Sequence, residues 1–275
     1  MQETPNHRGS STTMIVVAAG VLLLIVMSIA ASIYLPYHQK RKVDQVVRAR
    51  GGAVAAWDYY GPTLIPESQR HRFTVWDRNR NIDLTSTPTT DADLILLREQ
   101  FHLVDLELGF TRISDAGLVH LKGLTILRQI DLRGTAITDA GLVHLKGLKN
   151  LHEIYLGQTQ ITDKGLEHLK GLPNLDVLDF DNTAITDDGL ENLKGLTKLV
   201  GLNLGDTAIS DSGLEHLKAF KKLKYLKLVR TKITDAGLEH LKALTSLEGI
   251  ALDGTAITPD KREELQKALP DPFTK

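Results

Sequence analysis

The feature that most constrains the fold is a hexapeptide that recurs every 24 residues. The motif reads Ile-(Thr/Ser)-Asp-x-Gly-Leu, and it begins at Ile113, Ile137, Ile161, Ile185, Ile209 and Ile233. Successive motifs are 24 residues apart, as in 137 − 113 = 24, without insertion. A strict period of this length is typical of solenoids, in which a unit buries its apolar residues only against its neighbours. Weaker matches upstream extend the array to seven units, from Thr89 to Ala256, because 7 × 24 = 168 residues.

Each unit has two halves with different periodicity. In the third unit the first half, Asp139 to Lys146, carries leucines at helical spacing, and Thr138 or Asp139 can cap its first turn. The second half, Leu151 to Leu156, alternates apolar and polar residues like a short strand. We therefore expect one short helix and one short strand in each unit. Strands pack about 4.8 Å apart and helices about 8–10 Å apart, so we expect the parallel sheet on the concave side.

The pattern LxxLxLxxT followed by ITDxGLxxL resembles leucine-rich repeats, of the bacterial type related to the ribonuclease-inhibitor-like subclass. The resemblance covers the chain from about Phe73 to its C-terminus. It implies an α/β leucine-rich-repeat solenoid that binds proteins or other ligands through its concave sheet, and it names no ligand. Many family members have Asn or Cys after the strand, whereas this chain has Thr, which we expect to satisfy loop backbone groups. These threonines are Thr87, Thr111, Thr135, Thr159, Thr183, Thr207, Thr231 and Thr255.

An uncharged, mainly aliphatic stretch precedes the repeats. It runs from Met14 to Leu35, and its 35 − 14 + 1 = 22 residues would form a helix about 33 Å long. We expect a transmembrane helix that tethers the chain as a single-pass membrane protein. The alternative is a cleaved signal peptide, which has a shorter apolar region behind a basic start. Residues 38–50 carry five basic residues and one acidic residue, 5 − 1 = +4, which favours a cytoplasmic solenoid.

Six segments follow from these patterns. They are an N-terminal tail (1–13), the transmembrane helix (14–35), a juxtamembrane segment (36–72), an N-terminal cap hairpin (73–88), the leucine-rich repeats (89–257), and a C-terminal capping helix and tail (258–275). In the hairpin, Phe73–Trp76 would pair with Ile82–Leu84. The last helix would begin after Thr258, with proline at its first position, and run to Leu269. An aromatic cluster before the repeats either caps the core or forms a second contact site; it consists of Trp57, Tyr59, Tyr60, Phe73 and Trp76.

Composition excludes several functional classes. The chain has no cysteine, which rules out disulfides, thiol nucleophiles and cysteine zinc sites. Its net charge of −1 gives no attraction to nucleic acid. It contains no GxSxG, phosphate-loop or HExxH motif. We therefore expect no catalytic residues, no cofactor, no small-molecule substrate and no enzymatic activity.

Two polar columns accompany the predicted helices. One consists of His120, His144, His168, His216 and His240. A metal site would need imidazoles about 2 Å from one ion, whereas these lie one per helix, so we expect no metal ligands here. The second column consists of Lys122, Lys146, Lys170, Lys194, Lys218 and Lys242. We interpret it as a solvated face that complements the helix dipoles; contact with an anionic surface such as lipid headgroups is the alternative.

The outward positions of the strands are the candidate binding site. Acidic residues outnumber basic ones there by 8 to 2, most strongly in the first half of the array. We expect a protein partner with a basic surface, with Tyr155 as an aromatic anchor; plain solvated strand positions are the alternative. We also expect Glu107 and Asp131 to tolerate reversal to lysine without loss of fold. The candidate residues are Asp83, Asp105, Glu107, Asp131, Arg133, Glu153, Tyr155, Asp179, Asp181, Asn203, Tyr225, Lys227 and Asp253.

Taken together, the patterns predict a membrane-tethered leucine-rich-repeat module for protein–protein interaction. One alternative is a structural scaffold at a membrane or envelope surface, organised by the tether and the lysine column. Another is the substrate-recognition subunit of a ubiquitin-ligase-like assembly. That function would require an adaptor-binding helical motif, and residues 36–72 show none.

Overall fold

The computed structural model describes residue 45, residues 48–51 and 53–55, and residues 81–269. The chain divides into two compact units, and all described residues belong to the unit formed by Val43–Trp57 and Arg78–Lys275. The predicted transmembrane helix and the aromatic cluster lie outside the described residues. Within the described part of the chain, no helix is long and apolar enough to cross a membrane.

The described strands form one nine-stranded sheet in sequence order. Its first strand pairs antiparallel with the second, and all later neighbours pair in parallel. In each pairing from β2 onward, a residue faces the one 24 positions later, as Leu106 faces Ile130. The strands are β1 (Ala53–Ala55), β2 (Asn81–Asp83), β3 (Asp105–Glu107), β4 (Gln129–Asp131), β5 (Glu153–Tyr155), β6 (Val177–Asp179), β7 (Gly201–Asn203), β8 (Tyr225–Lys227) and β9 (Gly249–Ala251).

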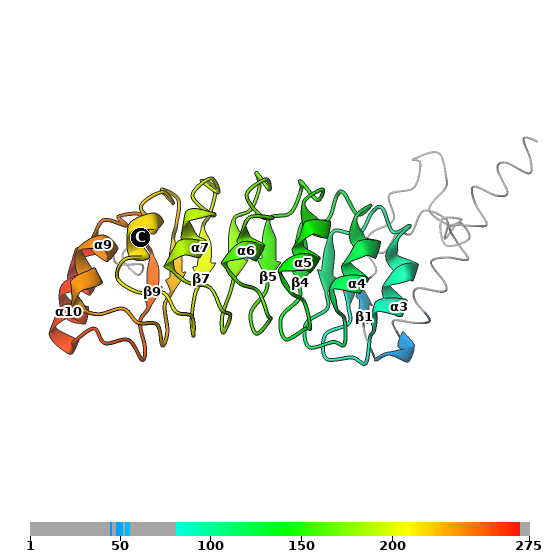
Figure 1. The fold of residues 1–275 in the computed structure, drawn as a ribbon, viewed down its shortest axis with the longest axis horizontal. Coiled ribbons are helices and arrows are strands. Elements are labelled where there is room, and N and C mark those ends of the chain that lie inside the picture. The colour runs from blue at the N-terminus through cyan, green and yellow to red at the C-terminus, as the bar shows by residue number, and fades with distance from the viewer. Residues whose placement is uncertain (1–44, 46–47, 52, 56–80, 270–275) are drawn as a thin grey trace, which may run out of the picture. The chain divides into compact units, whose positions relative to one another are not determined.

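Short helices connect the strands and lie along one side of the sheet (Figure 1). Several are a single α-helical turn continued by a 3-10 turn. The helical segments are α3 (Asp91–Leu94), η2 (Ile95–Leu97), α4 (Asp115–Leu118), η3 (Val119–Leu121), α5 (Asp139–Leu142), η4 (Val143–Leu145), α6 (Asp163–Leu166), α7 (Asp187–Glu191), α8 (Leu214–Leu217), η5 (Asp235–Gly237), α9 (Leu238–Lys242) and α10 (Pro259–Ala268). The alternation of short helix and short strand confirms the prediction from the repeat.

The recurring hexapeptide ties each repeat to the next. The hydroxyl of Thr138 caps α5, as expected. The carboxylate of Asp139 instead accepts from the backbone N–H of Thr162 at 2.8 Å and from its hydroxyl at 2.6 Å, one repeat later. At Gly141, a Cβ atom would lie 2.3 Å from Oδ1 of Asp115, the equivalent aspartate one repeat earlier. In this motif the threonine therefore caps the helix, the aspartate links adjacent repeats, and the glycine leaves room for that link.

The threonine after each strand satisfies a loop carbonyl, as predicted. The hydroxyl of Thr183 donates to the carbonyl oxygen of Phe180 at 2.7 Å, and Thr183 is only 8% exposed. The equivalent threonines donate to the carbonyl three residues earlier. This contact closes the turn without a second side chain, and replacing the hydroxyl would leave a buried carbonyl unpaired.

Both ends of the aliphatic core are covered within the described residues. At the C-terminal end, Leu265 of α10 is 1% exposed, and the helix begins after Thr258 as its proline predicts. At the other end, β2 has β1 on one edge and β3 on the other. The antiparallel partner of β2 is thus Ala53–Ala55. The strand Phe73–Trp76 of the predicted cap hairpin lies outside the described residues.

Candidate binding face of the sheet

The parallel register brings the strand-borne candidate residues onto one exposed face. In each strand from β2 to β8 the middle residue is buried in the core, as Ile130 is in β4. The third residues form one row across the sheet, in which Glu107, Asp131 and Tyr155 are successive neighbours. Since parallel strands lie about 4.8 Å apart, neighbouring members of this row interact directly. We call this surface the sheet face.

Carboxylates are crowded at the N-terminal end of the sheet face. Glu107 lies between Asp83 on β2 and Asp131 on β4. Its burial, together with the charges of Asp131 and Asp83, raises the pKa of Glu107 to about 7. The side-chain amide of Gln129 donates to Oε1 of Glu107 at 2.6 Å. Negative charge is therefore costly at this position, and a cationic partner would relieve the repulsion.

Asp131 is committed to an internal ion pair. Its side chain is 1% exposed, and Oδ2 accepts from Nη2 of Arg133 at 2.7 Å. The backbone N–H of Arg133 also donates to Oδ1 at 2.9 Å. Reversal of Asp131 to lysine would bury an unpaired charge beside Arg133. The structure therefore contradicts the expectation that Asp131 tolerates this change, although Glu107 is not paired in the same way.

Tyr155 belongs to the same network. The guanidinium carbon of Arg133 lies 5.2 Å from the centre of its ring, a cation–π distance. Its hydroxyl donates to Glu153 at 2.5 Å, and burial together with this carboxylate raises the pKa of Tyr155. By contrast, Tyr225 is 56% exposed. The structure therefore offers Tyr225 as the more accessible tyrosine for a partner.

Charge is more balanced toward the C-terminal strands. Burial raises the pKa of Asp179, whose Oδ1 accepts the backbone N–H of Asp181 at 3.0 Å. Nζ of Lys227 lies 3.7 Å from Asp181. At the last strand, the exposed side chain of Asp253 lies 3.8 Å from Arg262. The carboxylates of the sheet face are thus most closely spaced around Glu107.

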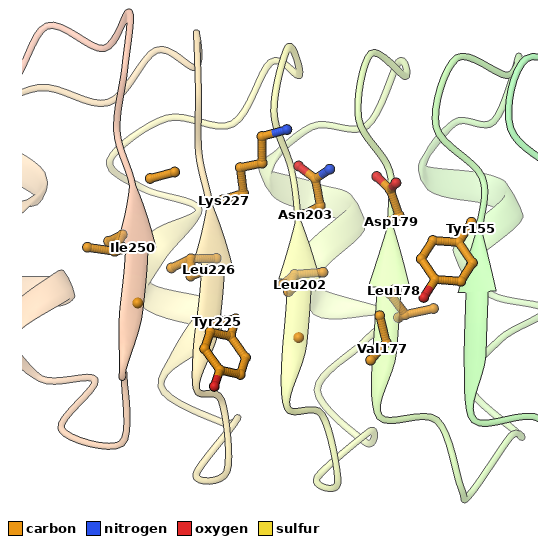
Figure 2. Close-up of a pocket in the computed structure, with 13 residues that line it drawn as sticks. Tyr155, Val177, Leu178, Asp179, Leu202, Asn203, Tyr225, Leu226, Lys227 and Ile250 are labelled. Atoms are coloured by element: carbon orange, nitrogen blue, oxygen red, sulfur yellow. The ribbon is translucent and has the colours of Figure 1, made fainter. Parts of the chain in front are cut away.

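A shallow groove of about 500 Å³ occupies the C-terminal half of the sheet face (Figure 2). Gly201 lies between Val177 and Tyr225 in the row of first strand residues, so no side chain fills the space between those two. Asn203 and Lys227 line the same groove from the row of third residues. The groove thus combines apolar walls with a polar edge, a combination that suits an amphipathic side chain or peptide.

Gly201 is a functional candidate that the sequence analysis did not single out. A Cβ atom at this position would lie 3.5 Å from Cγ2 of Val177, an ordinary contact. Its φ is not in the left-handed region, so the backbone does not require glycine there. Glycine inside a strand weakens it and marks places where another molecule approaches the backbone. The signal in the sequence was glycine at an outward strand position, which recurs at Gly249.

The histidine column lies half-buried at the helix layer. Burial and the charge of Lys122 lower the pKa of His144. Nδ1 of His144 and Nδ1 of His168 have no hydrogen-bond partner. In the part of the chain that the structure describes, no group of three His, Cys, Asp or Glu residues could hold a metal ion.

Comparisons with known proteins agree with this architecture. A family model described as leucine-rich repeat matches residues 99–121 and 221–242. The crystal structure of internalin C2 from Listeria monocytogenes is 30% identical, with a TM-score of 0.55, over 68% of this chain and 77% of that one. A second internalin of that organism, InlF, is 19% identical over 64% of this chain and 69% of its own, with a TM-score of 0.40. A search of curated proteins gave no significant match.

The fold is a repeat solenoid with one strand and one short helix in each unit. The strands form a single sheet, and the helices lie on the side opposite the sheet face. The 30% sequence identity to internalin C2 and the match to the leucine-rich-repeat family model make the assignment specific. The chain belongs to the leucine-rich-repeat family.

Proposed function

We propose that the chain is a binding module that recognises a protein partner through the sheet face. The observation that carries the proposal is the contrast between constant core positions and a sheet face that differs from strand to strand. The groove at Gly201 accommodates an apolar side chain of the partner against Val177 and Tyr225. The carboxylates around Glu107 attract basic residues of the same partner. Specificity would come from the groove, and association rate from the charge.

The same proposal gives the chain no enzymatic role. The sheet face is open, and its carboxylates are spread over several strands, whereas acid–base catalysis works best in a site that excludes water. We further propose that residues 14–35 tether the module to a membrane and that the solenoid faces the cytoplasm. The length of this apolar stretch and the basic residues that follow it support both statements.

Photo-crosslinking in living cells tests the proposed face. A photoreactive phenylalanine analogue replaces Tyr225 in the full chain, in cells that naturally express it. The matched control places the same analogue at Glu215, an exposed residue on a helix of the same repeat. We expect a discrete protein adduct from position 225 and none from position 215. An adduct from position 215 alone would show that the binding site lies on the helices and not on the sheet face.

Charge neutralisation then tests the chemistry of the partner. The double variant Asp83→Asn, Glu107→Gln replaces two carboxyl groups with isosteric amides. The control Asp188→Asn, Glu191→Gln makes the same replacements at exposed helix positions. We expect the first variant to reduce the yield of the adduct from position 225 by several-fold, and the control to leave it unchanged. Equal yields in both variants would exclude a partner that binds through the acidic end of the sheet face.

A further inference from the structure

The outer surface of the helices changes character along the array. In each helix two positions, three residues apart, point away from the core. In the first three repeats both are apolar and exposed: Ala92 and Ile95, Ala116 and Val119, Ala140 and Val143. The side chain of Ile95 is 49% exposed, that of Val119 41% and that of Val143 42%. In the last four repeats the second of these positions is an exposed glutamate: Glu167, Glu191, Glu215 and Glu239.

An aromatic residue extends this surface. Phe101 is 53% exposed, and a Cβ atom added at Gly123 of the next repeat would lie 3.7 Å from Cε1 of its ring. The ring therefore lies over Gly123, at the C-terminal end of the second helix. We define Phe101 and the six residues named above as the outer apolar stripe. Solvent-exposed alkyl groups at equivalent positions of three successive helices are costly unless something covers them.

The exposed charges around the stripe are predominantly basic. Arg98, Lys122 and Lys146 are exposed at the helix C-terminal ends, where Glu99 is the exposed acid, which gives 3 − 1 = +2. The aspartates lie at the opposite, N-terminal ends of these helices, where each keeps its charge and binds the capping residue of the next repeat. The helices of the last four repeats carry four exposed lysines and five exposed acids on the same surface, 4 − 5 = −1. The lysines are Lys164, Lys170, Lys194 and Lys218, and the acids are Glu167, Asp188, Glu191, Glu215 and Glu239.

The size of the stripe argues against a stable protein partner. Its four large side chains, about half exposed, present on the order of 300 Å² of apolar area together, whereas a stable protein pair buries about 800 Å² on each side, of which a little over half is apolar. Alkyl and aromatic groups beside cations are instead the pattern of a surface that enters the headgroup region of a bilayer. Anionic lipids attract such cations with about 1 kcal/mol for each basic residue near the surface.

We propose that the outer apolar stripe and its basic rim dock on an anionic lipid surface. The proposal needs a membrane within reach, which the proposed tether supplies. Arg50 lies 50 − 35 = 15 residues after the apolar segment and donates to Asp93 of α3 at 3.1 Å. Fifteen residues span at most about 50 Å, so an anchor at that segment would hold Arg50 within that distance of the membrane. Docking through the helices leaves the sheet face available for its partner.

Site-specific fluorescence in reconstituted vesicles tests this. The chain contains no cysteine, so Val119→Cys and Glu191→Cys each provide one site for a polarity-sensitive fluorophore at equivalent positions three repeats apart. The full chain is placed in vesicles of phosphatidylcholine with phosphatidylglycerol that contain a lipid-bound quencher. We expect at least twofold stronger quenching at position 119 than at 191. Vesicles without phosphatidylglycerol, or the additional change Lys122→Glu, Lys146→Glu, should remove most of the difference.

Each remaining outcome overturns the proposal in a recognisable way. Equal quenching at positions 119 and 191 would show that the stripe does not contact lipid. A blue-shifted label at position 119 without lipid quenching would show that protein covers the stripe, either a second copy or another partner. Failure of the tether is detected by a separate measurement, the release of the chain from the vesicles at alkaline pH, because only an untethered chain is released.

Discussion

The first three repeats and the last four share a scaffold and differ on both of their surfaces. Leucines at equivalent positions are buried in every repeat, and each hexapeptide aspartate binds the capping residue of the repeat that follows. The first repeats combine closely spaced carboxyl groups on the sheet face with exposed apolar side chains on the outer surface. The last repeats combine an apolar groove on the sheet with a charged outer surface. In a solenoid both surfaces can therefore change along the array while the core period stays fixed.

The largest predicted effect tests whether the scaffold is the same in both regions. Leu118→Ala in the second repeat and Leu190→Ala in the fifth each remove a side chain that is 0% exposed. We expect both to lower the free energy of unfolding by about 3 kcal/mol. Val119→Ala should cost less than about 1 kcal/mol, because its side chain is already partly exposed. Urea unfolding measures all three, and a clearly smaller loss at Leu190 would show that the two regions are not equivalent.

The threonine after the strand should matter in every repeat. Thr183→Val keeps the shape of the side chain and leaves the carbonyl of Phe180 without its donor. We expect a loss of about 2 kcal/mol in unfolding free energy, because a buried acceptor loses its hydrogen bond. Thr197→Val, at an exposed loop position, is the matched control. A melting temperature equal to that of the parent protein would show that water replaces the hydroxyl.

The repeating part of the fold was predictable because its information is local. Strand alternation, helical leucine spacing and the proline at the first position of α10 each specify an element within a few residues. The capping role of Thr138 was visible in the same way. The contact of Asp139 with Thr162 was missed because it joins residues 23 positions apart that meet only when repeats stack. The same contact explains the glycine of the hexapeptide, because a Cβ atom there would collide with the aspartate of the preceding repeat.

The candidate site was predicted in outline only. Alternation placed the outward strand residues on one face, and the register confirms that placement. Alternation cannot tell which acids are already paired, and Asp131 proved to be bound to Arg133 on the same chain segment. The outer apolar stripe was not predicted, because a single exposed valine such as Val119 is unremarkable. It becomes visible only when Val119 is compared with Glu167 and Glu191, which occupy the equivalent position in later repeats.

The acidic end of the sheet face should show a distinctive pH dependence. The pKa of Glu107 is raised to about 7, above its ordinary value of 4.5. The folded chain therefore holds this proton more tightly than the unfolded chain, and stability falls as pH rises from 4.5 through 7. Glu107→Gln carries no charge at any pH and keeps an oxygen for the amide of Gln129. We expect this variant to be more stable than the parent at pH 8 and equal to it near pH 4, below the ordinary pKa of 4.5.

Water around the half-exposed carboxyl screens most of this effect, so the expected gain at pH 8 is about 1 kcal/mol. Urea unfolding of both proteins at several pH values gives the measurement. Glu167→Gln, on the exposed outer helix surface, is the control for charge removal alone. If both variants changed stability by the same amount at every pH, crowding by Asp83 and Asp131 would not be the cause.

The smallest predicted change in stability separates scaffold from function in the C-terminal repeats. Gly201→Ala adds a Cβ atom in ordinary contact with Val177. Because alanine restricts the unfolded chain and the site accepts it without strain, we expect a gain of about 0.5 kcal/mol in unfolding free energy. The same methyl group fills the floor of the groove beside Tyr225, so it should reduce crosslinking from position 225 by several-fold. Gly147→Ala, with no heavy atom within 4 Å of the new Cβ, is the matched control and should leave crosslinking unchanged. A Gly201→Ala chain that is more stable and crosslinks as well as the parent would show that the groove does not hold the partner.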